Sequence, residues 1–353
     1  MRRSAIVLAL VAPALILLFF WLRPDLDPTL RVPLLHFYIV SFTSLSATVV
    51  SFLLVAALGA VARPRHVLAA VAFAVMGSLF SVHGLTTPGA IIPTTHPAVP
   101  AVSLSSWLTL FSGGLIFAMT ALDHPRQNAQ RFLLRLIFLA ALGIMLFIAV
   151  VVTVPHWLGA LEASAAPWHR RVLFFFSFAV WALAAIQLFQ IWRESGNRID
   201  GTLALVAALL TQATFSMHLF PLWNLSWWMY HLILLGSFLV TAYVLFTTYE
   251  QAQEFRLSHY FLAAASILTV LLALVASYLF SAFVESFLVG AGSATDGLAA
   301  AAVQAQTAQL TDAVIRARTT GLLIAAGTMG LLFMMLWLVV RRADRIILLR
   351  NEE

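Results

Sequence analysis

The sequence contains neither cysteine nor lysine, and these two absences exclude several kinds of chemistry. Without cysteine, these 353 residues cannot form a disulfide, a thiolate metal site or a c-type haem attachment. Without lysine, they have no amine for a retinal or pyridoxal Schiff base, and no Walker-type phosphate loop. Light-driven rhodopsin chemistry is therefore ruled out.

Charge of either sign is also scarce. Only 10% of the residues are charged and 62% are hydrophobic, far from the averages of soluble domains. The net charge of +6 comes from arginines that stand singly or in pairs beside apolar stretches, so we interpret them as topology signals and expect no binding to nucleic acid. The composition predicts an all-α, polytopic transmembrane protein whose main partner is the lipid bilayer.

The apolar stretches set the expected number of membrane spans. A spanning helix needs about 20 mainly apolar residues. The sequence offers ten such stretches, at residues 5–22, 35–61, 67–83, 103–122, 136–155, 172–192, 201–219, 226–249, 260–283 and 320–340. We keep the first as a helix, because Trp21-Leu22-Arg23-Pro24 provides no small-residue cleavage site for a signal peptide.

The arginines indicate an orientation. With the N-terminus inside, fourteen of the twenty arginines fall on the cytoplasmic side, so we expect both termini in the cytoplasm and the chain in a bacterial cytoplasmic membrane. Several tryptophans then lie near the outer interface, where an indole ring can be buried while its N–H stays hydrated. They are Trp107, Trp157, Trp168, Trp223, Trp227 and Trp228.

A polar run at residues 250–258 suggests a boundary between two parts. We expect residues 1–250 to form an eight-helix membrane body. Residues 251–353 are expected to form a two-helix transmitter, with an outer helical stalk at 285–319 and an exit helix into the cytoplasm. The chain stops within the pattern of this exit helix, which suggests truncation. Ile346 and Leu349 have the spacing of neighbouring coiled-coil core positions, so we expect a homodimer through the exit helix.

Four histidines are expected at one membrane level on the outer side. His36 begins the second span, His83 ends the third, His218 ends the seventh, and His231 lies about a turn and a half into the eighth. Short connections make each pair of spans an antiparallel hairpin. Two hairpins can therefore bring four imidazoles together.

These histidines are the candidate metal ligands. Imidazole is the commonest protein ligand for zinc and copper. We place copper ahead of zinc because Met217 and Met229 stand near two of the histidines and thioethers suit Cu(I). Two alternatives stay open: a b-type haem held by two of these histidines, and interfacial histidines that only form hydrogen bonds.

Acidic residues are absent from the middles of the first eight expected spans. This disfavours proton-coupled transport and zinc hydrolysis, which usually need a carboxylate. The strongest polar candidates within the spans are Gln187, Gln190 and Gln212. The nearest acids on the outer side are Asp25, Asp27 and Glu162.

The C-terminal part resembles the membrane-to-cytoplasm junction of bacterial sensor histidine kinases and membrane nucleotide cyclases. The resemblance rests on the outer helical segment, the last span and the Arg-rich exit helix at 341–353. His83-Gly84-Leu85-Thr86-Thr87-Pro88-Gly89 and Trp227-Trp228-Met229-Tyr230-His231 are also similar to multi-span input regions of such receptors. The resemblance implies dimeric signalling to a C-terminal output domain, or to a partner kinase or cyclase. This sequence contains no such domain, so we expect no catalysis within it.

The leading expectation is therefore a sensory input module, a receptor whose outer histidines bind a metal or cofactor. The alternatives are a membrane redox or metal-dependent enzyme subunit that uses the same histidines, and a small-molecule transporter.

Overall fold

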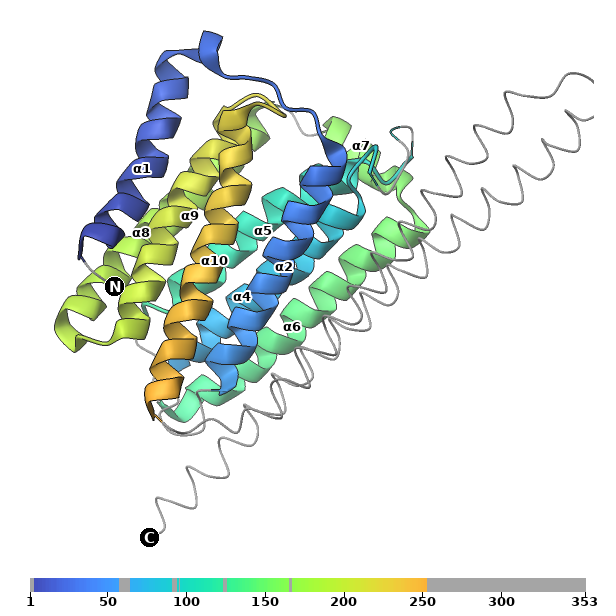
Figure 1. Ribbon diagram of the computed structural model, residues 1–353. Coiled ribbons are helices and arrows are strands. Elements are labelled where there is room, and N and C mark those ends of the chain that lie inside the picture. Colours follow the sequence, from blue (N-terminus) through green and yellow to red (C-terminus); the bar gives the residue numbers. More distant parts are fainter. Residues whose placement is uncertain are drawn as a thin grey trace, which may run out of the picture.

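The computed structural model describes residues 3–56, 64–90, 94, 96–122, 126–164 and 167–252. The two spans expected at 260–283 and 320–340, the stalk and the exit helix lie outside the described residues. Within the described part, the regular structure is helical and contains no strand (Figure 1). The helices are α1 (Arg3–Leu22), η1 (Pro24–Leu26), α2 (Pro33–Ala56), α4 (Pro64–Leu85), α5 (Pro100–Met119), α6 (Arg126–Thr153), α7 (His156–Ser164), α8 (Pro167–Ser195), α9 (Arg198–Leu219) and α10 (Leu225–Ala252).

Local sequence explains where many of these helices begin. Proline at the first helical position has no amide hydrogen to leave unpaired, and its fixed φ suits the helix. Four helices begin in this way, with Pro33, Pro64, Pro100 and Pro167. At the turn between α8 and α9, Gly196 takes a φ of 63°, a conformation that glycine adopts without steric cost. The side chain of Asn197 then accepts a hydrogen bond from the Ile199 amide and caps α9.

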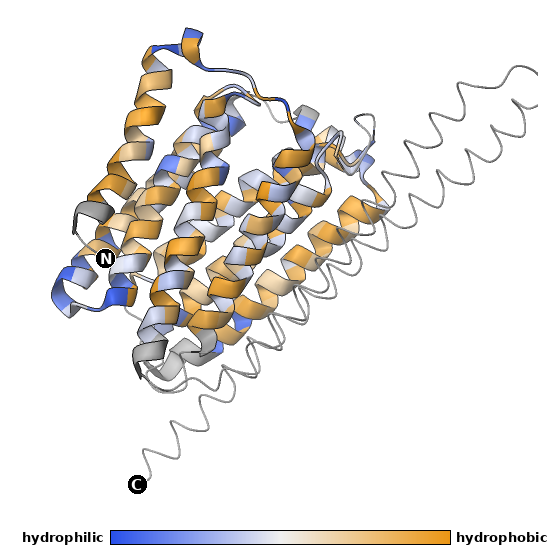
Figure 2. Cartoon of the chain, viewed as in Figure 1, coloured by the Kyte–Doolittle hydropathy of each residue, from blue (hydrophilic) through white to orange (hydrophobic). Residues whose placement is uncertain are grey.

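The first eight expected spans correspond to α1, α2, α4, α5, α6, α8, α9 and α10. Seven of them, all except α1, are long and apolar enough to cross a membrane, and α1 contributes a shorter apolar run, Val7–Leu22. Exposed hydrophobic side chains are numerous on α1, α6 and α8, which indicates surfaces that face lipid. Hydrophobic residues extend along most of α1 and α6 (Figure 2). These features suggest a multi-pass membrane protein. The short helix α7 is a finding that the sequence analysis did not anticipate.

Six helices form a closed ring in which each contacts the next, in the order α2, α4, α5, α8, α9 and α10, with α10 returning to α2. α6 packs on α4, while α1 packs on α9 and α10. Aromatic rings fill the interior. The ring centroid of Phe73 on α4 lies 5.8 Å from that of Phe117 on α5 and 5.3 Å from that of Phe238 on α10. Because α2, α5 and α6 pack around it, α4 is buried along almost its whole length.

All four candidate histidines lie at one end of this bundle, which we call the histidine end. α2 and α10 begin there, whereas α4 and α9 end there. The segment before α2 is fixed to this end, because the Asp27 carboxylate accepts a hydrogen bond from the Ser226 amide at the start of α10. Thr29 and Asn224 also form an isolated β-bridge. Asp27, expected from the sequence only as an acid near the histidines, thus has a structural contact.

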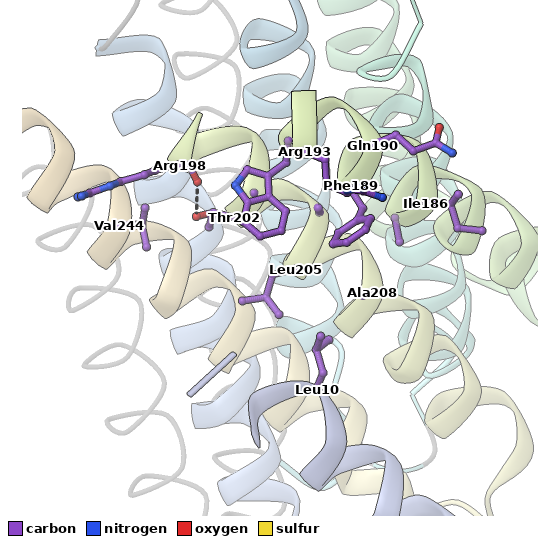
Figure 3. A pocket seen from close by; sticks show the side chains of 14 residues that line it. Leu10, Ile186, Phe189, Gln190, Arg193, Arg198, Thr202, Leu205, Ala208 and Val244 are labelled. Carbon is purple, nitrogen blue, oxygen red and sulfur yellow. Dashed lines mark hydrogen bonds between the residues drawn. The ribbon is translucent and has the colours of Figure 1, made fainter. Parts of the chain in front are cut away.

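A groove of about 720 Å³ lies toward the opposite end, between α1, α8, α9 and α10 (Figure 3). Its walls are mainly apolar, with Leu10, Phe189 and Leu205 among them, and Arg193 and Arg198 also line it. Further along α9, the Gln212 amide donates to the backbone oxygen of Leu10, which ties α1 to the ring. This contact gives Gln212 a structural role.

Candidate metal centre and a buried carboxylate

Three buried histidines from three helices converge at the histidine end. The Nε2 atom of His36 lies 3.1 Å from Nε2 of His83 and 2.9 Å from Nε2 of His231. One ring nitrogen from each residue lies within 4.8 Å of the other two. All three side chains are almost completely buried, with exposures of 2%, 3% and 0%. The three histidines therefore lie close enough together to hold a metal ion.

The antiparallel packing of α2 and α4 sets the level of the first two ligands. His36 follows Pro33 in the first turn of α2, and His83 lies in the last turn of α4. The two helices approach closely at Gly77, whose backbone oxygen accepts a hydrogen bond of 2.7 Å from Ser44. α10 packs against α2 and brings His231 to the same place from its second turn.

The spacing of the nitrogens suits a small ion. Zinc–nitrogen bonds of about 2.0–2.1 Å place the nitrogens of a tetrahedral site about 3.3 Å apart. The two Nε2 separations from His36, 2.9 and 3.1 Å, are slightly shorter than this value, and the three nitrogens all lie within 4.8 Å of one another. Side-chain rotation would bring the three nitrogens to tetrahedral spacing. No large backbone movement is needed to form a three-histidine site.

A neighbouring group also indicates which ring nitrogen of His83 carries the hydrogen. Nδ1 of His83 lies 2.7 Å from the backbone oxygen of Val102. A carbonyl oxygen can only accept, so Nδ1 carries the hydrogen and Nε2 presents its lone pair. Such a contact is the usual support of a metal-bound histidine.

His36 has a comparable partner. Its Nδ1 lies 3.0 Å from the Thr87 hydroxyl, which itself donates to the backbone oxygen of His83. In the tautomer in which Nδ1 of His36 donates to this hydroxyl, Nε2 of His36 is left with a lone pair. The Nε2 atoms of His36 and His83, 3.1 Å apart, can then both bind one metal ion.

Aromatic side chains surround the three histidines, and we call this group the aromatic cage: Phe80, Trp223, Trp227, Trp228 and Tyr230. The Trp227 ring stacks on His36 at 5.6 Å, and the Tyr230 hydroxyl lies 3.2 Å from Nε2 of His83. Trp223 takes a φ of 69°, an unusual conformation for a bulky residue, and its ring lies 5.5 Å from His36.

The fourth predicted ligand, His218, is not part of the three-histidine group. It lines a cavity of about 510 Å³ that also reaches His36 and His83. Its ring lies 5.7 Å from that of Phe174, and its buried Nε2 has no hydrogen-bond partner among the described residues. The structure thus brings three of the four predicted ligands together and places the fourth in the wall of the neighbouring cavity.

The sequence pattern places Trp223, Trp227 and Trp228 at the membrane interface, whereas in the structure their rings pack around the histidines. Trp227 and Trp228 are buried, with exposures of 6% and 4%. A signal was available, because Trp227 and His231 are four residues apart and so share one face of α10. No role was expected for Tyr230.

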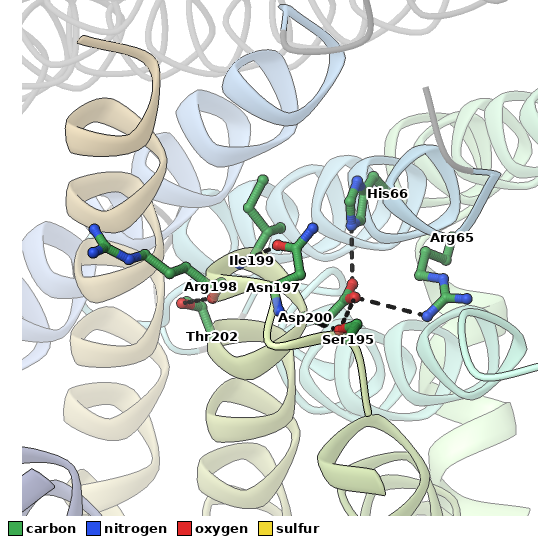
Figure 4. Close-up of polar contacts among 8 residues, drawn as sticks. All are labelled: Arg65, His66, Ser195, Asn197, Arg198, Ile199, Asp200 and Thr202. Atoms are coloured by element: carbon green, nitrogen blue, oxygen red, sulfur yellow. Dashed lines mark hydrogen bonds and ion pairs between the residues drawn. The ribbon is translucent and has the colours of Figure 1, made fainter. Parts of the chain in front are cut away.

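A second polar cluster lies at the opposite end of the bundle, around Asp200 (Figure 4). Nε2 of His66 lies 3.0 Å from its carboxylate, the Ser195 hydroxyl lies 3.1 Å away, and the Arg65 guanidinium 3.8 Å away. The Asp200 side chain is fully buried. The cluster joins the start of α4 to the start of α9 and the end of α8.

This carboxylate was not expected within a span, because the apolar run of the seventh span begins at Gly201. The Asn197 cap instead starts α9 at Arg198, and Asp200 then lies in the first turn of a membrane-spanning helix. Its position there also suits the positive end of the helix dipole. The expectation that span middles lack acids is unaffected, because Asp200 lies at the end of its span.

Replacing Asp200 with alanine should lower the free energy of unfolding by about 3 kcal/mol, because it leaves the buried His66 and the partly buried Arg65 without their partner. Thermal unfolding of the purified protein in detergent measures the loss. Asp200→Asn is the matched control, since it retains an acceptor for His66 and should lose less. Equal stability of wild type and Asp200→Ala would contradict a structural role for the cluster.

Comparison of the chain with protein-family models, with curated proteins and with solved structures found no match. The fold and the site together define a class, a multi-pass helical protein with a buried three-histidine centre.

Proposed function

We propose that this chain is a metal-binding receptor module of a membrane, in which His36, His83 and His231 bind one transition metal ion. The observation that carries the proposal is the convergence of three buried imidazole nitrogens within 4.8 Å of one another. Buried polar groups are costly unless they are satisfied. Hydrogen bonds within the described residues satisfy most of these ring nitrogens, and a metal ion would replace the contacts that the Nε2 atoms make with one another.

The geometry favours a bare ion over a b-type haem. Two axial histidines of a haem lie on opposite faces of the porphyrin, with nitrogens about 4 Å apart for metal–nitrogen bonds of about 2 Å. Here His36 approaches both other nitrogens to about 3 Å, closer than an intervening iron allows. The aromatic cage also occupies the space next to these rings.

Copper is the metal that we favour, with zinc as the alternative. Three neutral imidazoles leave the charge of the ion uncompensated, and a singly charged Cu(I) ion costs less to bury than a divalent one. Met217, which is buried and lines the neighbouring cavity, adds a thioether near the site.

The path of α10 supports a signalling role. His231 lies near the beginning of this helix, which continues without interruption to Ala252, about 32 Å further along at 1.5 Å per residue. A movement of His231 on metal binding would therefore be transmitted along α10 to its end, next to residues 253–353. We propose that this segment relays the change to a C-terminal cytoplasmic output domain or partner kinase or cyclase, in a homodimer in the bacterial cytoplasmic membrane.

One observation favours a second candidate, a metal-dependent or redox enzyme subunit. The cavity of about 510 Å³ borders two of the three ligands, His36 and His83, so a small molecule can approach the metal. Catalytic metal sites with three protein ligands keep an open position of this kind. Turnover of a substrate by the copper-loaded chain would distinguish the enzyme from the receptor.

The first test is metal binding by the intact chain. Protein purified in detergent, incubated with copper and separated from excess ion should retain about one equivalent of copper by elemental analysis. Zinc loading under the same conditions gives the relative preference. An absorption spectrum of the protein as purified tests for haem through its Soret band. Retention of no metal, or a stoichiometric Soret band, would overturn the proposal.

A further inference from the structure

We infer that the cavity beside the three-histidine centre binds a small organic carboxylate, which completes the coordination of the metal. This inference rests on the proposed metal site and names the class of ligand to which the site responds. Four observations carry it: the charge of the site, the position of the cavity, the charges at its rim and an unpartnered histidine.

The charge of the centre is the first observation. All three ligands are neutral imidazoles, and within the described residues the group includes no carboxylate. A copper or zinc ion in this site keeps a charge of one or two units while buried. An uncompensated buried charge is costly, so an anion gains more in this position than a neutral ligand does.

The position of the cavity is the second observation. His36, His83 and Tyr230 form part of its wall, so a molecule inside it can reach the metal. A volume of about 510 Å³ falls within the range of small-molecule pockets. Phe174 and Leu222 line it as well, which gives the apolar body of an organic anion a surface to contact.

The charges around the cavity are the third observation. Arg170 and Arg171 line it, together with one acid, Glu162, so arginine is in excess. The guanidinium of Arg170 lies over the Trp107 ring, 5.3 Å from its centroid, and this contact positions it. Within the described part of the chain, neither arginine forms a salt bridge. Exposed positive charge at a cavity entrance attracts anions and raises their local concentration.

His218 supplies the fourth observation. Its Nε2 is buried, and no described residue offers it a hydrogen bond. The side chain lines the same cavity as His36 and His83. A ligand carboxylate has two oxygens. One can bind the metal, while the other can accept a hydrogen bond from His218. This assigns a role to the histidine that the three-histidine group leaves out.

The experiment uses the full chain loaded with Cu²⁺ and follows its electron paramagnetic resonance spectrum during titration with butyrate at constant ionic strength. Butyrate should change the spectrum saturably, and 1-butanol, its uncharged counterpart, should not. The Arg170→Gln/Arg171→Gln variant should bind butyrate at least about 10-fold more weakly, because it removes two positive charges from the entrance. Arg193→Gln/Arg198→Gln, at the other groove, is the matched control and should bind butyrate as the wild type does.

His218→Ala provides the second variant. It should retain copper but bind butyrate more weakly, because it removes the proposed hydrogen-bond donor. A Cu²⁺ spectrum that does not respond to butyrate overturns the inference and leaves the metal site intact. An equal response to butyrate and 1-butanol also overturns it, as does unchanged butyrate affinity in the Arg170→Gln/Arg171→Gln variant. Failure of the wild type to retain copper in either oxidation state, or zinc, is a separate result, which overturns the proposed function and this inference together.

Discussion

Replacing His36 with alanine should lower the copper affinity of the protein by more than about 100-fold. Loss of a residue that only supports a ligand typically costs 10- to 100-fold in metal affinity, and loss of a ligand should cost more. His36 is the central one of the three proposed ligands, because its Nε2 lies within 3.1 Å of the corresponding atoms of both His83 and His231. Competition with a copper chelator of known affinity measures the change.

Two further histidines provide the controls. His169 is exposed, and His169→Ala should leave the copper affinity unchanged. His218→Ala distinguishes the structural assignment from the four-ligand site that the sequence predicted. A loss as large as that of His36→Ala would favour four ligands, whereas a His36→Ala variant with normal affinity would refute the site altogether.

Gly77→Val should disturb both the fold and the metal centre. A Cβ atom at this position would lie 3.0 Å from the Thr48 hydroxyl and 3.1 Å from the backbone oxygen of Ser44 on α2. A backbone atom cannot rotate away, so α2 and α4 must separate. We expect a loss of about 1–3 kcal/mol in the free energy of unfolding, typical of overpacking. His36 and His83 lie on these two helices, so copper affinity should fall as well.

Gly143→Val is the matched control for this substitution. Gly143 also lies within a helix, α6, but a Cβ there would meet no atom within 4 Å. Both substitutions change intrinsic helix propensity in the same way, so the difference between them isolates the contact between α2 and α4. Thermal unfolding and chelator competition on both variants test the prediction. Equal stability and equal copper affinity in the two variants would show that the close approach at Gly77 is unimportant.

The sequence predicted the helices of the membrane body well, because a span of about 20 apolar residues is a strong signal. It also predicted that His36 and His83 would lie at one level, since a short connection makes neighbouring spans antiparallel. The structure describes the helices of the first eight expected spans. The ring order of the helices was beyond the sequence, because spacing along the chain does not determine which distant helices pack together.

The choice among the four histidines could not be predicted for a related reason. His218 and His231 belong to one hairpin and share a level, but level does not determine the direction in which a side chain points around its helix. Only packing against α2 directs His231 toward His36. Asp200 was missed because the start of the seventh helix was placed too late. The apolar run begins at Gly201, and it does not reveal the polar first turn that Asn197 caps.

The three tryptophans of the aromatic cage should make the intrinsic fluorescence of the protein sensitive to copper. The rings of Trp223, Trp227 and Trp228 all lie within 5.7 Å of His36. Copper ions quench indole emission at such short range, so copper bound at the proposed centre should lower the intrinsic tryptophan fluorescence of the chain. The seven other tryptophans should contribute a background of fluorescence. The fluorescence of the wild-type protein would then measure copper occupancy without an attached label.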